Sequence, residues 1–143
     1  MDKKVLTQRL DRLVSVLVRL RENRCATCGK KLSWRYRQAG HFVPRVVQQT
    51  RWDFFNVHVQ CAHCNVELGG NIEKYKQFIA DNYGIITFAR LTAAHEEYKQ
   101  GRGKSFTEDE MRDLYNNLLA IARMAEEEEV MTLIPKDWKP DPC

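Results

Sequence analysis

The sequence predicts an α+β protein in which helices flank a small core that is closed by cysteines. Two Cys-x-x-Cys pairs, Cys25/Cys28 and Cys61/Cys64, enclose residues 29–60, an interval that is longer than a zinc ribbon needs and can hold a β-hairpin. On either side of this core, apolar residues recur at helical spacing. We therefore divide the 143 residues into an N-terminal amphipathic helix (1–24), a core (25–71), a C-terminal helical region (72–130) and an extended tail (131–143).

The N-terminal helix is indicated by leucines that recur at alternating spacings of four and three residues. They line one face of a helix over residues 2–23: Leu6, Leu10, Leu13, Leu17 and Leu20. Such a stripe suits packing against the core, and it equally suits the seam of a coiled-coil dimer. Three heptads do not decide between these two interpretations.

Helices are also expected after the core. The first spans residues 72–83 and ends at Gly84, the second spans 86–100, and the third begins with a capping box formed by Thr107 and Glu110. The third helix carries an apolar stripe that can pack on the N-terminal helix or join a dimer interface: Met111, Leu114, Leu118, Ile121 and Ala125.

The two cysteine pairs predict a structural zinc site. Four thiolates complete a tetrahedral zinc site, and each Cys-x-x-Cys pair supplies two of them: Cys25, Cys28, Cys61 and Cys64. Two disulfides or buried free thiols are the alternative. No signal peptide is recognisable, so we expect a cytoplasmic protein, in which disulfides rarely persist. No apolar run reaches the roughly 18 residues that cross a bilayer, so no membrane partner is expected.

The distribution of charge points to nucleic acid. Residues 1–60 hold 13 lysines and arginines against 4 acidic residues, whereas residues 61–143 hold 10 against 15. A positive surface of this kind attracts a polyanion, although a solvated face without a partner is the alternative. The candidate DNA-binding residues are Lys30, Lys31, Arg35, Arg37, Arg45, Arg51 and His58. Residues 30–37 can instead form a strand whose Trp34 and Tyr36 face inward.

The polar residues of the core follow an order that resembles the HNH, or ββα-metal, nuclease site. His41 follows Gly40 in a strand-like stretch, and a neutral imidazole suits a general base near pH 7. The resemblance implies that Asn56 ties the hairpin loop to neighbouring backbone. It also implies that Asn65 ligates Mg²⁺ or Mn²⁺ from the start of a helical element, although Asn65 can instead simply cap that helix.

Four motifs together resemble the phage NinG/Rap recombination proteins. They are Cys-x-x-Cys-Gly at 25–29, Ala-Gly-His-Phe at 39–42, Asn-x-His-x-Gln-Cys-x-x-Cys-Asn at 56–65 and Gly-Asn-x-x-x-Tyr at 70–75. The resemblance covers roughly residues 5–125, and the plan is similar to the junction-resolving endonuclease VII of T-even phages. It implies a zinc-stapled endonuclease that cuts branched recombination intermediates, Holliday junctions and D-loops. Such a protein is encoded by a phage or prophage and acts in the bacterial host cell. A two-fold symmetric junction favours a homodimer.

One departure from the family pattern keeps other functions open. Relatives carry an Asp three residues before the His, whereas this chain has Gln38, and Asp53, His58 and Glu67 are candidate substitutes. A branched-DNA endonuclease is the favoured function. An HNH endonuclease on ordinary duplex and a non-catalytic zinc module that binds DNA are the alternatives.

Overall fold

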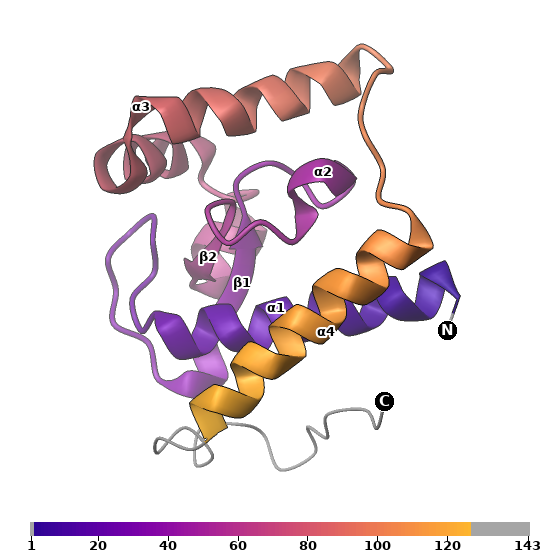
Figure 1. Cartoon of the computed structure of the whole chain (residues 1–143). Coiled ribbons are helices and arrows are strands. Elements are labelled where there is room, and N and C mark those ends of the chain that lie inside the picture. Colours follow the sequence, from indigo (N-terminus) through magenta and orange to yellow (C-terminus); the bar gives the residue numbers. More distant parts are fainter. Residues whose placement is uncertain (1, 127–143) are drawn as a thin grey trace.

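The computed structural model describes residues 2–126. Its sheet has two strands and lies between two helical layers, as Figure 1 shows. Helices α1 and α4 lie side by side on one side of the sheet, and α2 and α3 lie on the other. The predicted α+β class is confirmed, with helix predominating. The elements are α1 (Lys3–Arg21), β1 (Gln38–His41), α2 (Gln48–Arg51), β2 (Val57–Gln60), α3 (Ile72–Lys99) and α4 (Glu108–Glu126).

Helix α1 buries the first three leucines of the predicted stripe within the chain itself, whereas Leu17 and Leu20 are half-buried. The Asp2 carboxylate accepts a hydrogen bond from the Val5 N–H at 2.9 Å and caps the helix start. Leu6 and Leu10 are fully buried and belong to one core with α4 and both strands. Because these side chains are already covered, the stripe is not free to form a coiled-coil seam.

The sheet is antiparallel, and its register pairs His41 with Val57 and Gly40 with His58. Only glycine fits at position 40, since a Cβ there would lie 1.9 Å from the Oε1 atom of Gln60. The Tyr75 hydroxyl donates to the Gly40 carbonyl at 2.7 Å and ties α3 to β1. The contacts of Gln60 and Tyr75 at Gly40 fix the position of β1, the strand that carries His41.

Helix α3 bends at Gly84, as the predicted break requires. Gly84 has φ 85° and ψ 168°, which lie outside the helical region and favour glycine. On either side of the bend, Tyr75, Ile79 and Leu91 pack with Phe42 from the loop after β1 in a second, smaller core.

Helix α4 begins with the predicted capping box. The Thr107 N–H donates to Glu110 Oε2 at 2.8 Å, and the Glu110 N–H donates to Thr107 Oγ1 at 3.2 Å. The predicted apolar stripe is wrong at Ile121, which is 53% exposed. The face that packs on α1 is rotated, and it is formed by Met111, Tyr115, Leu118, Leu119 and Ala122.

The alternative of an inward-facing strand over residues 30–37 is wrong. Trp34–Tyr36 form a single 3₁₀ turn, and Tyr36 is exposed. The tail predicted for residues 131–143, with Cys143, lies outside the described residues. Within residues 2–126, no helix is long and apolar enough to cross a membrane.

Candidate functional site

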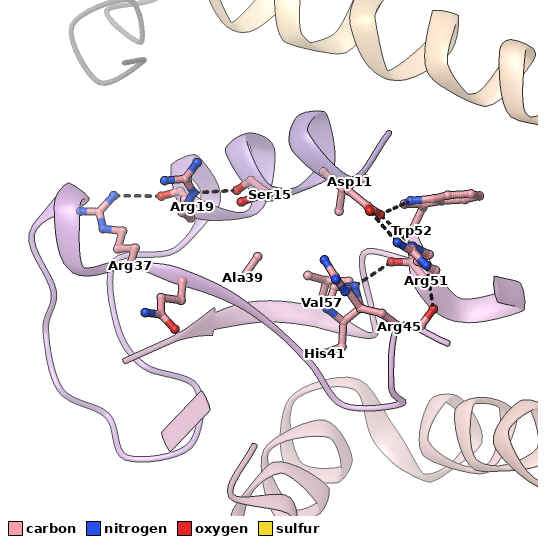
Figure 2. A pocket seen from close by; sticks show the side chains of 12 residues that line it. Asp11, Ser15, Arg19, Arg37, Ala39, His41, Arg45, Arg51, Trp52 and Val57 are labelled. Carbon is pink, nitrogen blue, oxygen red and sulfur yellow. Dashed lines mark hydrogen bonds and ion pairs between the residues drawn. The ribbon is translucent and has the colours of Figure 1, made fainter. Parts of the chain in front are cut away.

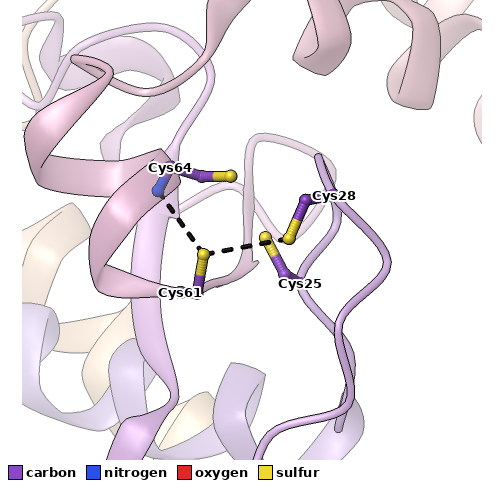
Figure 3. A group of neighbouring side chains, drawn as sticks. All are labelled: Cys25, Cys28, Cys61 and Cys64. Atoms are coloured by element: carbon purple, nitrogen blue, oxygen red, sulfur yellow. Dashed lines mark hydrogen bonds between the residues drawn. The ribbon is translucent and has the colours of Figure 1, made fainter.

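The four predicted zinc cysteines meet at one point, shown in Figure 3. Their Sγ atoms all lie within 4.8 Å of one another, and those of Cys28 and Cys61 are 3.8 Å apart. Four sulfurs bound about 2.3 Å from a tetrahedral zinc lie about 3.8 Å from one another. The donor set and its spacing therefore fit a structural zinc ion, with no position left open for water.

Backbone hydrogen bonds bring the two cysteine pairs together. The Gly29 N–H donates to the Cys25 carbonyl at 2.8 Å and closes the first turn, in which Gly29 has a φ of +77°. The Ala26 N–H donates to the Val59 carbonyl at 2.8 Å and fixes this turn against β2. Because Cys61 directly follows β2, the second pair arrives at the same place.

The thiols differ in acidity because their surroundings differ. Burial raises the pKa of Cys25, but hydrogen bonds from the Thr27 hydroxyl and from nearby backbone N–H groups outweigh it and bring the pKa to about 6. Burial and the neighbouring Cys25 raise the pKa of Cys28 to about 12. The Asn71 amide also donates to Cys64 Sγ at 3.6 Å, a supporting contact typical of metal ligands.

His41 lies in a separate pocket of about 340 Å³ between α1 and β1, shown in Figure 2. Its Nε2 atom is 2.9 Å from the Arg51 carbonyl oxygen. A carbonyl only accepts hydrogen bonds, so Nε2 carries the proton and the neutral ring keeps a lone pair on Nδ1. Burial lowers the pKa of His41, since the Arg51 carbonyl only partly offsets it. The ring is therefore neutral at pH 7.

Asn56 makes the contacts with neighbouring backbone that the HNH resemblance implies. Its side chain is fully buried; Oδ1 accepts from the Val43 N–H at 2.7 Å, and Nδ2 donates to the carbonyls of Val43 and Thr50 at 3.0 Å each. These bonds close the segment between β1 and β2. That segment includes the Arg51 carbonyl, which orients His41.

The pocket around His41 is strongly cationic. Within residues 2–126, Arg45 makes no side-chain hydrogen bond or ion pair. Arg37 donates to the carbonyls of Leu32 and Arg19, which fixes its direction. Four arginines line the pocket: Arg19, Arg37, Arg45 and Arg51.

Arg51 is held by Asp11, which also lines the pocket. The Arg51 guanidinium donates to the Asp11 carboxylate through Nε at 2.8 Å and through a terminal nitrogen at 2.6 Å, and Trp52 Nε1 adds a third bond at 2.9 Å. Burial alone would raise the pKa of Asp11, but these bonds hold it below its usual value. Because its guanidinium already binds Asp11, Arg51 is less available to bind phosphate than the sequence predicted.

Asn65 contacts Gln38, and within residues 2–126 it is not among the side chains that line the His41 pocket. It lies in the π-helical turn His63–Glu67 that follows the second cysteine pair, and its Nδ2 donates to Gln38 Oε1 at 2.9 Å. None of the three candidate substitutes for the family Asp supplies a free carboxylate. Asp53 pairs with Arg90 at 2.6 Å and Glu67 pairs with His63 at 2.8 Å.

The prediction that His58 contacts DNA is wrong. Its side chain is fully buried, so no phosphate reaches it. Its Nδ1 is 2.8 Å from Glu22 Oε2, its Nε2 is 3.0 Å from the Phe55 carbonyl oxygen, and its ring stacks on Tyr83. His58 therefore links the end of α1 to β2 and α3. Because His58 is buried and both ring nitrogens already have partners, it does not take the place of the Asp that relatives carry at position 38.

Comparison with known proteins places the chain in a phage family. The family model described as "Bacteriophage Lambda NinG protein" matches residues 2–128. The chain belongs to the NinG family. One curated NinG relative, the Protein ninG of Salmonella phage P22, is 29% identical over 76 residues, which make up 52% of this chain and 37% of that protein. No solved structure matches.

Two pocket residues of this NinG family member escaped the sequence analysis. Asp11 and Arg19 both belong to α1, and the sequence placed that helix only as a packing or dimer element. A weak signal was present at Asp11, which is the only acidic residue among the basic residues of this helix. A carboxylate there needs a cationic partner, but nothing in the sequence identifies Arg51 as that partner.

Proposed function

We propose that the chain is a metal-dependent endodeoxyribonuclease that cuts branched DNA intermediates, including Holliday junctions and D-loops. The observation that carries this proposal is the setting of His41. Its ring is fixed by the Arg51 carbonyl, is neutral at pH 7 and lies in a pocket lined by four arginines. A base beside the guanidinium groups of Arg45 and Arg51 suits the hydrolysis of a phosphodiester.

The order of elements supports an HNH-like plan. His41 ends the first strand, Asn56 directly precedes the second, and Asn65 lies in the helical turn after it. This order supports the strand, strand and helix arrangement that a ββα-metal site would have, with the short turn His63–Glu67 in the helix position. A zinc ion held by the four cysteines would be structural in this plan, because four thiolates leave it no open position.

The chemistry divides among the residues of the pocket. Arg45, at the His41 end of the pocket, would bind and orient the phosphate, because guanidinium groups match phosphate oxygens bidentately; Arg19 and Arg37 line the other end, shown in Figure 2. His41 Nδ1 would take a proton from the attacking water. When bound, Mg²⁺ or Mn²⁺ would neutralise charge on the phosphate and on the leaving oxygen.

The side chains that could bind this cation offer the oxygen atoms that it prefers, but they carry no negative charge. Asn65 and Gln38 carry amide oxygens, which are hard ligands, and they would hold the ion together with water. Among the residues that the structure describes, Asp11 is the one carboxylate that lines the pocket, and Arg51 and Trp52 already bind it. Mg²⁺ is usually held by one or two carboxylates, so we expect weak binding of the cation.

This pairing of two neutral amides favours a second candidate function. A chain that binds branched DNA through its arginines and zinc module, without cutting it, would need no carboxylate at position 38. An HNH endonuclease acting on ordinary duplex remains a third candidate, since the pocket itself does not select for branches.

Cleavage of a labelled four-way DNA junction, beside a linear duplex of the same arms, tests the proposal. We expect the junction to be cut in Mg²⁺ or Mn²⁺, and His41→Ala to abolish cutting while junction binding survives. Gln38→Asp adds a carboxylate beside Asn65, and it should lower the Mg²⁺ concentration that cleavage needs. Equal cutting of both substrates would favour the duplex endonuclease. Binding without cutting, in the native chain and in Gln38→Asp alike, would favour the non-catalytic module.

We also propose that the protein acts in the bacterial host cell as a homodimer. A two-fold symmetric junction is matched by a two-fold symmetric enzyme. Leu6, Leu10 and Leu13 of α1 are buried in the core with α4, so a dimer would use another surface.

A further inference from the structure

A second cavity lies beside the cysteine cluster and has no role in the function proposed above. Its volume is about 690 Å³, within the usual range for a ligand pocket. One wall is the segment from the first cysteine pair to β1, and the other is the start of the second pair. Its lining combines cationic, aromatic and apolar side chains, among them Lys30, Lys31, Leu32, Arg35 and Tyr36.

Tyr36 is an aromatic side chain held outward at this cavity. It is 59% exposed, although it belongs to an ordered 3₁₀ turn that the Tyr36 N–H closes on the Ser33 carbonyl at 3.0 Å. Trp34 anchors the turn, because the Arg19 guanidinium lies 4.6 Å from the centre of its ring. The turn therefore presents the Tyr36 ring to solvent on a fixed support.

The cations around Tyr36 are free to meet an anion. Within residues 2–126, Lys30, Lys31 and Arg35 make no side-chain hydrogen bond or ion pair. The Arg35 guanidinium lies over one face of the Tyr36 ring, 5.2 Å from its centre, so a base would stack on the opposite face with this charge close by. A flat aromatic surface beside free cations is the combination that binds single-stranded nucleic acid, by base stacking and phosphate contact.

The cavity adjoins the His41 pocket. Gln38 lines both of them, so it forms a shared wall. A phosphate in the His41 pocket would therefore bring a neighbouring nucleotide of the same strand to the second cavity. In duplex DNA both faces of a base are covered by its neighbours, whereas at a branch point a base can leave the stack.

We propose that this cavity binds an unpaired base of branched DNA, stacked on the Tyr36 ring, with Lys30, Lys31 and Arg35 holding the adjoining phosphates. The inference rests on the proposed function for the position of the scissile phosphate, but base binding itself needs no cleavage. It would give the chain its preference for branches over duplex.

The test uses the native zinc-loaded chain with no Mg²⁺ or Mn²⁺ added. DNA junctions and flaps carry 2-aminopurine at the branch point, and matched duplexes carry it at an internal position. Tyr36→Ala should weaken binding to branched DNA about 5- to 150-fold, the loss that removal of one base–aromatic stack gives. Binding to duplex should change less than about twofold, because it depends on phosphate contacts. Tyr36→Phe should bind like the native chain.

The fluorescence of the probe supplies a second measurement. The branch-point base should be more strongly quenched in complexes with the native chain and with Tyr36→Phe than in the complex with Tyr36→Ala. The matched control is Tyr98→Ala, which removes a tyrosine that is 40% exposed on α3 and should leave both measurements unchanged.

Two outcomes would overturn the inference: native-like binding of branched DNA by Tyr36→Ala, or an equal loss of branched and duplex binding. Failure of the proposed function would look different. A native chain that stacks the branch-point base on Tyr36, yet never cuts in Mg²⁺ or Mn²⁺, would retain this site and lose the nuclease. A chain that cuts junctions regardless of Tyr36 would retain the nuclease and lose this site.

Discussion

Replacing Asn56 by alanine should destabilise the fold strongly, because its amide closes the loop between the two strands. The variant loses three hydrogen bonds, to the Val43 N–H, the Val43 carbonyl and the Thr50 carbonyl. Val43 and Thr50 are only 2% and 1% exposed, so water does not readily replace the lost partner. A net hydrogen bond contributes about 1 kcal/mol, and a buried group left without a partner costs about 1–3 kcal/mol. We therefore expect a loss of about 3–5 kcal/mol in the free energy of unfolding.

Urea denaturation of the zinc-loaded protein, monitored by circular dichroism, measures the free energy of unfolding. In a thermal scan, a loss of this size in a domain of about this length should lower the melting temperature by about 10–15 °C. Asn82→Ala is the matched control, since Asn82 makes one exposed hydrogen bond to the Phe78 carbonyl at 2.9 Å. That change should alter stability by less than about 0.5 kcal/mol. Equal stability of the Asn56→Ala and Asn82→Ala proteins would refute the reasoning.

Two further predictions concern the zinc cluster and His41. Cys64→Ser removes a buried ligand, so elemental analysis should show loss of stoichiometric zinc and the protein should unfold at a lower urea concentration; retention of native zinc would contradict a four-cysteine site. The cleavage rate should fall on acidification with a midpoint below about 6.5, because burial lowers the pKa of His41. The pKa of His41 is lower in the folded protein than in the unfolded chain, so at a pH between these two values the unfolded chain binds more protons. His41 therefore also lowers the free energy of unfolding as the pH falls below about 6.5. An acid limb centred above pH 6.5 would exclude His41 as the base.

The local features of this protein were predictable because each depends on residues close together in the sequence. The capping box at Thr107 and the helix break at Gly84 are determined within one helical turn. The leucine period gave the buried face of α1, and the Cys-x-x-Cys spacing gave the metal cluster. The order of His41, Asn56 and Asn65 was likewise enough to propose a site.

The composition of the His41 pocket was decided by tertiary structure alone. Asp11 reaches Arg51 across 40 positions of sequence because α1 packs on the sheet, and that contact joins the N-terminal helix to the site. The packing of α3 on the opposite face buries His58 against Tyr75, Phe78 and Tyr83, although the strand pattern left it equally free to face solvent. Gln38 and Asn65 meet only because the strands pair and the cysteine pairs converge. Sequence periodicity fixes which face of an element is apolar, whereas the rotation and docking of each element decide which polar side chains come within a hydrogen bond of one another.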